Sequence, residues 1–151
     1  MLDLKKFSSS PVTLFKKYCD KGIHLNMLKQ LVNDGNAKVF SVYENEKTAT
    51  YLHSYFQLSY PEIKTTHRHS SEEFDICFTN FEETKNILLE NINNTNVDFC
   101  NVLIINDIHF DHPEKIYLIM LWLQIFRVSK TRPYLLITTD SYLIPEIPFN
   151  L

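Results

Sequence analysis

The chain contains very little glycine: only Gly22 and Gly35 occur among its 151 residues. A loop that surrounds phosphate with backbone amides needs glycine for close approach and for positive φ angles. Neither the G-x-x-x-x-G-K-[ST] pattern nor the G-x-G-x-x-G pattern occurs in the sequence. The sequence therefore excludes the usual phosphate-binding loops.

Cysteine is also scarce and widely spaced. Cys19, Cys77 and Cys100 form no C-x-x-C pair, so we expect reduced, buried thiols in an intracellular protein, cytoplasmic or nuclear. The net charge of −3 provides no general attraction to nucleic acid or to anionic membranes. The start of the chain lacks the apolar stretch of a signal peptide, and the longest apolar run, 116–126, is too short to span a bilayer. We expect no membrane partner.

What is present is enough apolar surface for a core, since 44% of the residues are hydrophobic and 13% are aromatic. Short apolar runs alternate with helical periodicity along the chain. Strands are expected at 38–43, 63–66, 73–79, 101–105 and 134–139, and helices at 11–20, 23–32, 44–59, 80–89 and 113–128. This alternation predicts one α/β domain over residues 1–151, a three-layer sandwich with a mainly parallel sheet of about five strands.

The most informative segment is the apolar run Val102–Ile105 with the polar residues that follow it. Its uninterrupted aliphatic character predicts a strand that is covered on both faces of a parallel sheet. In such sheets, ligands bind beyond the carboxyl ends of the strands. We therefore expect Asn106, Asp107 and His109 at the functional edge, although Asn106 and Asp107 are equally placed to cap the helix that begins at Pro113.

Four stretches resemble, in their order along the chain, the motifs of the first RecA-like domain of DExH-type superfamily 2 helicases. Segment 103–109 is similar to the strand that ends in Asp-Glu-x-His, and 136–140 is similar to the Ser-Ala-Thr strand that follows it. Segment 39–46 resembles a strand and turn that contact the nucleic-acid backbone, and 76–80 resembles the next such strand. The resemblance covers roughly residues 5–143 and depends more on order and spacing than on residue identity.

The resemblance implies a RecA-like, P-loop-NTPase-like fold and four sets of residues with separate roles. These are the vestigial catalytic residues Asn106, Asp107 and His109, the vestigial phosphate-loop residues Ser10 and Thr13, the nucleic-acid contacts Glu44, Asn45, Thr79 and Asn80, and the coupling residues Thr138 and Thr139.

The chain departs from this family at the residues that hydrolyse ATP. The phosphate-loop segment 7–13 has neither glycine nor the required lysine. In the family, the aspartate holds magnesium through water and the glutamate positions the attacking water. Here Asn106 supplies a neutral amide, and Asp107 supplies a shorter carboxylate. Each loss removes electrostatic stabilisation of the transition state. We therefore expect no ATPase activity in the isolated chain and no cofactor, with ATP and magnesium bound only if helicase activity is retained.

The leading functional hypothesis is a helicase-derived domain that has lost catalysis and binds a protein or a nucleic acid, RNA or DNA. The strongly apolar helix expected at 113–128 is the candidate protein contact, because its hydrophobicity requires either deep burial or a partner. Two alternatives use the same segments. One is a helicase fragment or subunit that depends on a second RecA-like domain, which the sequence does not contain, and the other is a structural subunit with this helix as its interface.

Metal-dependent chemistry is a further alternative. Asp107-x-His109 resembles the first metal motif of calcineurin-like metallophosphoesterases, but that family needs several further ligands, and only one more histidine, His112, follows. The spacings in His67-x-His69 and His109-x-x-His112 can each chelate zinc. Solvated loop residues are the commoner interpretation of the same four histidines.

Overall fold

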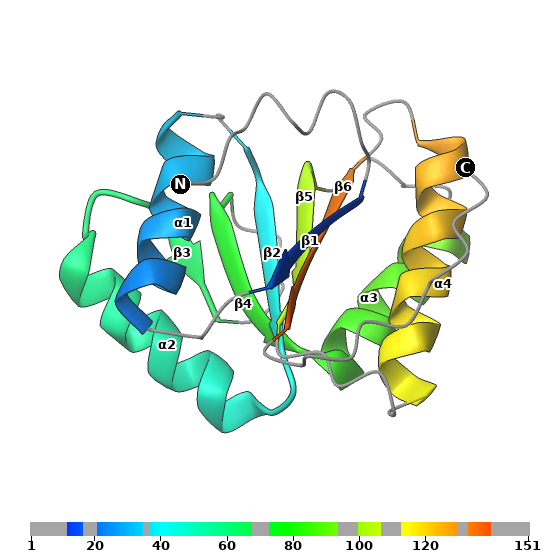
Figure 1. Ribbon diagram of the computed structural model, residues 1–151, viewed down its shortest axis with the longest axis horizontal. Helices are drawn as coiled ribbons and strands as arrows, with labels where there is room; N and C mark the ends of the chain where they lie inside the picture. Colours follow the sequence, from blue (N-terminus) through cyan, green and yellow to red (C-terminus); the bar gives the residue numbers. More distant parts are fainter. Residues whose placement is uncertain are drawn as a thin grey trace.

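The computed structural model describes residues 12–16, 21–34, 37–67, 73–93, 100–106, 113–129 and 133–139. Within these ranges, six strands form one sheet in the order β1-β6-β5-β2-β4-β3, and every neighbouring pair is parallel (Figure 1). Helices lie on both sides of the sheet, so the protein is a three-layer α/β sandwich, as the alternation of patterns in the sequence predicts.

Strands and helices alternate along the chain, except that β3 is followed directly by another strand, β4. In order, they are β1 (Val12–Lys16), α1 (Lys21–Asn33), β2 (Val39–Tyr43), α2 (Glu46–Ser59), β3 (Thr65–Thr66), β4 (Ile76–Asn80), α3 (Phe81–Asn93), β5 (Val102–Ile105), α4 (Pro113–Val128) and β6 (Tyr134–Thr139).

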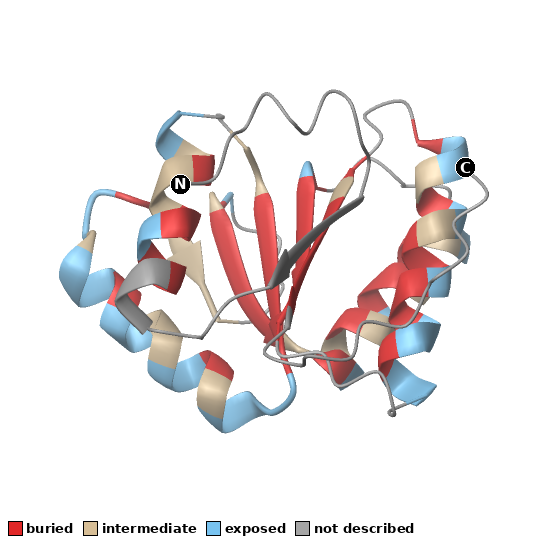
Figure 2. Ribbon diagram, in the orientation of Figure 1, coloured by how far each residue is buried: buried red, intermediate tan, exposed pale blue. Residues whose placement is uncertain are grey.

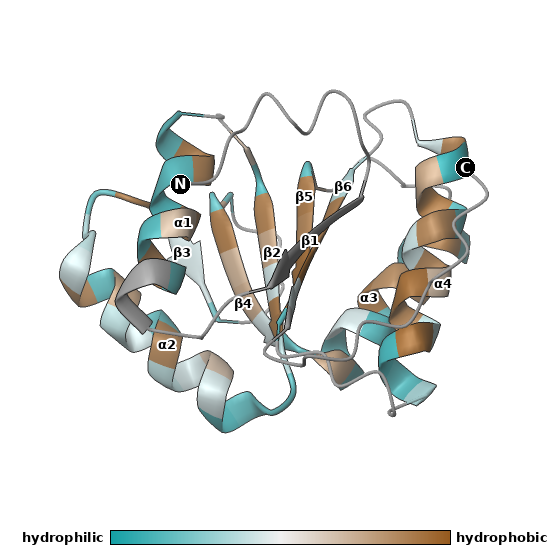
Figure 3. Ribbon diagram, viewed as in Figure 1, coloured by the Kyte–Doolittle hydropathy of each residue, from teal (hydrophilic) through white to brown (hydrophobic). Residues whose placement is uncertain are grey.

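The core has two halves, one on each face of the sheet. Helices α1 and α2 cover one face, and α3 and α4 cover the other (Figure 1). The side chains of β5 alternate between them: Val102 and Ile104 pack in the α1/α2 cluster, and Leu103 and Ile105 pack in the α3/α4 cluster. The central strands are buried (Figure 2) and hydrophobic (Figure 3) along most of their length. This explains why β5 appears in the sequence as an unbroken apolar run.

The helix expected at 11–20 is wrong. Residues 12–16 form strand β1, which pairs in parallel with β6, and the first helix, α1, begins only at Lys21. The sequence Val12-Thr-Leu-Phe-Lys is rich in β-branched and aromatic residues, which fit a pleated surface. Ser10 followed by Pro11 favours a helix start, which is why a helix is expected here, but pairing with β6 outweighs that local preference. β1 is the strand that raises the total from the expected five to six.

The later elements match their expected bounds closely. The strand expected at 134–139 and the helix expected at 113–128 have the same limits in the structure. In the described part of the chain, no helix combines the length and apolar character that crossing a membrane requires.

Candidate functional site

The candidate site lies at the carboxyl edge of the sheet, where the parallel strands end together. Val42 of β2 is level with Ile105 of β5, and Ile105 is level with Ile137 of β6. Asn106 comes directly after Ile105, so it lies between Tyr43 and Thr138 on the neighbouring strands. This is the edge at which the sequence predicts functional residues.

Asn106 is buried and fully engaged by hydrogen bonds inside the protein. Its side chain is 1% exposed. Nδ2 donates to the carbonyl oxygen of Val42 at 2.9 Å and to Oγ of Ser41 at 3.1 Å. Oδ1 accepts a hydrogen bond from Oγ1 of Thr138 at 3.2 Å. Both amide hydrogens are therefore used, and the amide ties β5 to the strands on either side of it.

The hydrogen bonds continue from Asn106 across the α1/α2 face of the sheet. Oγ of Ser41 donates to the hydroxyl oxygen of Tyr43 at 2.8 Å, and that hydroxyl lies 2.6 Å from Nε2 of His24 on α1. The ring of His24 meets the edge of the Tyr43 ring at a centroid separation of 5.6 Å. Thr138, Asn106, Ser41, Tyr43 and His24 thus form one buried chain of polar side chains, which we call the edge network.

Burial lowers the pKa of His24 to about 4. Desolvation is the cause, since a charged imidazolium loses its hydration in this position. His24 is therefore neutral near pH 7. The Tyr43 hydroxyl accepts a hydrogen bond from Ser41, so its own hydrogen is free to be donated to His24. Nε2 of His24 accepts this hydrogen bond only when it carries no proton. A neutral histidine is the form that this arrangement requires.

Asn45, expected as a nucleic-acid contact, caps α2. Its backbone is extended, and its Oδ1 accepts hydrogen bonds from the backbone nitrogen of Thr48 at 2.9 Å and from its hydroxyl at 3.0 Å. An asparagine at this position satisfies a backbone donor that the first helical turn leaves without an intrahelical partner. Glu44 and Glu46 on either side are exposed. The expected helix start at residues 44–46 is confirmed.

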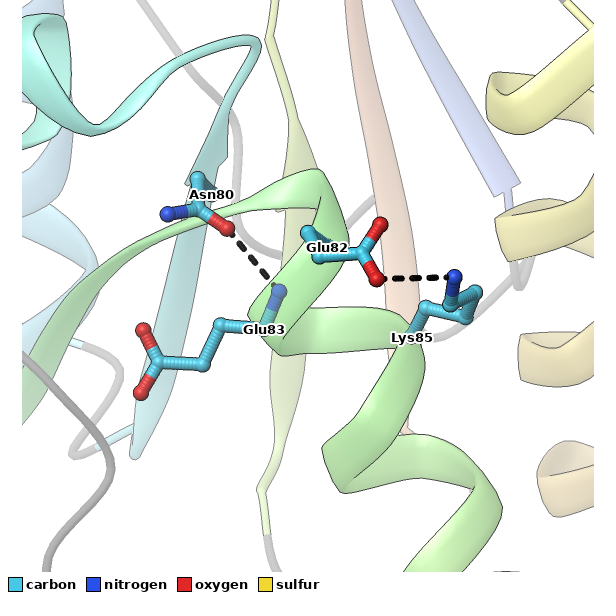
Figure 4. A network of polar contacts seen from close by, with 4 residues as sticks. All are labelled: Asn80, Glu82, Glu83 and Lys85. Atoms are coloured by element: carbon cyan, nitrogen blue, oxygen red, sulfur yellow. Dashed lines mark hydrogen bonds and ion pairs between the residues drawn. The ribbon is translucent and has the colours of Figure 1, made fainter.

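Asn80 does the same for α3. Its Oδ1 accepts a hydrogen bond from the backbone nitrogen of Glu83 at 2.9 Å (Figure 4). The hydroxyl of Thr79 donates to the Glu83 carboxylate at 3.1 Å, and Glu82 forms an ion pair with Lys85 at the same distance. The side chains of Thr79 and Asn80 therefore have local structural partners at the start of α3.

Several of the residues singled out from the sequence lie outside the described residues. These are Ser10, His69, Asp107, His109 and His112. Thr139 ends β6. Thr13 lies within β1, level with Leu136 and Ile104. It is therefore in a strand, two positions short of the level of Asn106, and not in a loop at the carboxyl edge.

His67 has its partners on α2, Thr50 and His53. Its Nε2 lies 2.6 Å from Oγ1 of Thr50. Its ring stacks on the ring of His53, with a centroid separation of 6.0 Å. Nε2 of His53 lies 2.9 Å from Oγ1 of Thr65. Burial, followed by the neighbouring His67, lowers the pKa of His53. Among the residues that the structure describes, no three His, Cys, Asp or Glu side chains are grouped in a way that suits a metal ion.

Cys77 and Cys100 are free, buried thiols in the α3/α4 cluster. Burial raises the pKa of each to about 12, so both are protonated at neutral pH. Such thiols are poor nucleophiles. The expectation that they are packing residues is confirmed for these two; Cys19 lies outside the described residues.

The outer face of α4 is apolar and exposed. Ile116, Tyr117, Met120 and Val128 lie on it, with Met120 58% and Val128 66% exposed. The opposite face of the helix packs in the core around Trp122, whose Nε1 donates to the carbonyl oxygen of Pro133 at 2.8 Å. The hydrophobicity of α4 thus has two causes: one face is buried, and the other carries an exposed apolar stripe, which we call the α4 stripe.

Sequence reasoning missed three members of the edge network: His24, Ser41 and Tyr43. The signals were present but weak. Ser41 interrupts an otherwise apolar strand, and His24 lies at helical spacing with the buried Leu28 and Leu31. A polar side chain at a core position needs a hydrogen-bonding partner. The identity of the partner depends on which strands are neighbours.

Comparison with known proteins assigns no family. No family model and no curated protein matches the chain. The edge network and the α4 stripe are therefore the basis for the function proposed below.

Proposed function

We propose that the chain is a helicase-derived, RecA-like domain that does not hydrolyse ATP and acts by binding a protein partner. The observation that carries this proposal is the closed hydrogen bonding of Asn106, the residue that stands where the resemblance requires a magnesium-holding carboxylate. The sheet order also supports it. Strands β5 and β6 carry the two motifs most similar to the family, and they are neighbours in the sheet, where Thr138 donates a hydrogen bond to Asn106.

Asn106 is a poor magnesium ligand for two separate reasons. Its amide is neutral, whereas magnesium sites use carboxylates together with water and phosphate oxygens. Turning the side chain outward would also break its hydrogen bonds to Ser41, Val42 and Thr138 in a buried place, where an unpaired polar group is costly. The inward orientation of Asn106 stabilises the protein. An outward orientation, which metal binding would require, is therefore unfavourable.

The connection after β1 also lacks the features that phosphate binding requires. In a parallel α/β sheet, a phosphate loop follows the first strand and precedes a helix. Residues 17–20 connect β1 to α1 and contain no glycine, and Gly22 belongs to α1. The lack of a phosphate loop therefore does not depend on which segment is aligned with the family's motif.

The described charges favour a protein partner over a nucleic acid. Glu44 and Glu46 flank the cap of α2, and Glu82 and Glu83 lie in the first turn of α3. These carboxylates lie beside the positions at which the resemblance implies nucleic-acid contacts, and they repel phosphate, with Glu82 partly neutralised by its ion pair with Lys85. The α4 stripe has the apolar character of the centre of a protein interface.

Isothermal titration with ATP and magnesium tests the loss of catalysis. We expect no binding heat at nucleotide concentrations up to about 1 mM and no phosphate release. Any binding would then have a dissociation constant above about 1 mM, which means a binding free energy weaker than about −4 kcal/mol. Asn106→Asp should not restore binding, because the phosphate loop is still missing. Asn86→Asp on the exposed side of α3 is the matched control for the added charge. Micromolar binding with turnover by the unmodified protein would contradict the proposal.

Fluorescence anisotropy with labelled single-stranded RNA and DNA tests the choice of partner. At low salt, where phosphate contacts are strongest, we expect no change in anisotropy. Binding that weakens as salt increases, and that strengthens when Glu82 and Glu83 are replaced by glutamine, would identify nucleic acid as the partner instead.

A further inference from the structure

Strand β3 is held to the rest of the sheet by few backbone contacts. It has two residues, Thr65 and Thr66, lies at the end of the strand order and pairs with β4. The backbone nitrogens of Asp75 and Ile76 both donate to the carbonyl oxygen of Lys64, at 2.8 and 3.2 Å. A segment with so few contacts opens more readily than the centre of a sheet does. Side chains that join β3 to α2 should therefore contribute to its position.

Two histidine–threonine hydrogen bonds join these segments, and each segment supplies one histidine. Nε2 of His53 on α2 lies 2.9 Å from Oγ1 of Thr65 on β3. Nε2 of His67, directly after β3, lies 2.6 Å from Oγ1 of Thr50 on α2. Spacings of three residues in a helix and of two residues in an extended chain each place side chains on one face, and these are the spacings found here.

The rings of His53 and His67 stack on one another. Their centroids are 6.0 Å apart, and their planes differ by 10°. Neutral imidazoles pack in this way without electrostatic cost, but two imidazolium ions at this separation repel one another. His53 is also half-buried, so its charged form loses hydration. Burial, followed by the charge of His67, lowers the pKa of His53. The contact therefore favours uncharged rings.

The elements packed against His53 supply no compensating carboxylate within the described residues. Phe78 of β4 packs against its ring at a centroid separation of 5.3 Å and is uncharged. The carboxylate of Asp75, directly before β4, accepts a hydrogen bond from the backbone of the chain leading to β3, and the Tyr43 hydroxyl of β2 is bonded to His24. The remaining charged side chains of α2 and of the chain leading to β3 are exposed: Glu46, Lys47, Glu62 and Lys64.

We propose that the His53–His67 pair makes this edge of the sheet sensitive to acid: β3 is held against α2 while the rings are uncharged and separates from it when both rings are protonated. This inference goes beyond the proposed function and depends on neither α4 nor nucleotide binding. In the open form the rings are apart and hydrated, so the open form binds protons more readily than the closed form does. Opening should therefore increase as the pH falls below 6.5, the ordinary pKa of histidine. Because β3 is the last strand, its separation leaves the backbone groups on the outer side of β4 unpaired.

Hydrogen exchange in the full chain, followed by NMR at Asp75 and Ile76, measures this opening, because both amides bond to Lys64 in the closed form. Dividing each rate by the intrinsic exchange rate at the same pH removes the effect of pH on the exchange chemistry. Between about pH 7.5 and about pH 5, we expect protection at both amides to fall. The expected fall is about tenfold, the size of the repulsion between two unit charges about 6 Å apart near a protein surface.

Three replacements separate the effect of charge from that of packing. His53→Gln retains a group that can bond to Thr65 but does not titrate, so the fall should be less than about twofold. His67→Gln removes the repulsion and leaves the burial of His53, so a smaller fall than in the unmodified protein is expected. His67→Arg carries a permanent positive charge and should retain the full fall as His53 titrates. Equal falls in the two His67 variants would contradict the role of its charge.

His24→Gln is the matched histidine control, since His24 lies on α1 and is bonded to Tyr43. It should leave the fall at Asp75 and Ile76 unchanged. Three further results would overturn the inference. They are constant protection across this pH range in the unmodified protein, a fall of the same size in His53→Gln, and loss of the fall in His24→Gln. The last result would mean that the edge opens only when the whole protein unfolds.

Discussion

Both faces of the sheet are buried, but they are held together by different interactions. The α3/α4 face is a cluster of hydrophobic side chains centred on Trp122, whose indole nitrogen is bonded to Pro133. The α1/α2 face combines a hydrophobic cluster with the edge network from Thr138 to His24. Burial of apolar surface is insensitive to pH, whereas a hydrogen-bonded network with a titratable end is not. The two faces should therefore respond to different perturbations.

The largest effect is expected on the apolar face. Trp122→Ala should lower the free energy of unfolding by about 4 kcal/mol, because it leaves a cavity and an unpaired carbonyl at Pro133. Urea denaturation measures this change. Tyr51→Ala on the exposed side of α2 is the control and should change the value by less than about 0.5 kcal/mol. Equal losses in the two variants would show that α4 does not hold the core as described.

The polar face should give a pH dependence of intermediate size. His24 has a pKa of about 4 in the folded protein and 6.5 in its unperturbed state. Between these values, the unfolded chain binds more protons than the folded protein does. The free energy of unfolding should therefore fall as the pH falls from about 6.5 to about 4, by about 3 kcal/mol in total.

His24→Gln isolates this contribution. Glutamine can still accept a hydrogen bond from Tyr43, but it does not titrate. Denaturation curves at several pH values between about 7 and about 4.5 should show a shallower loss for the variant than for the unmodified protein. His53→Gln is the control, since it removes a different histidine with a lowered pKa and leaves the His24 contribution in place. Parallel curves for the His24 variant and the unmodified protein would exclude His24 as the source.

The smallest expected effect concerns the far end of the edge network. Thr138→Val removes the hydroxyl that donates to Asn106 with little change in shape, and it should cost about 1 kcal/mol. In an Asn106→Leu background, the same replacement should cost much less, because the shared hydrogen bond is already gone. Additive effects in this double-mutant cycle would mean that the two side chains do not interact.

The sequence is sufficient to predict most of the fold. The bounds of α4 and β6 follow from long apolar patterns, and the start of α2 follows from Asn45, an efficient cap with a local partner at Thr48. β1 is the exception. Its five residues are too few for periodicity to separate a strand from a helix, and its pairing with β6 joins segments that are far apart in the chain.

The candidate site is less predictable for the same reason. The position of Asn106 at a strand end follows from the apolar run before it. Its hydrogen bond to Ser41 spans 65 residues, and that to Thr138 spans 32. No local pattern encodes these pairs, because they depend on the strand order β6-β5-β2. Sequence analysis therefore locates the edge of the sheet but does not identify the network that occupies it.

The two enclosed thiols give the molecule an internal reporter of its own motions. Cys77 and Cys100 lie in the cluster beneath α3 and α4, and a protonated thiol without access to solvent cannot react with an alkylating reagent. Alkylation at either position must wait for the helices to separate from the sheet. The rate at each cysteine, resolved by peptide mass spectrometry, therefore measures how often this half of the protein opens under native conditions.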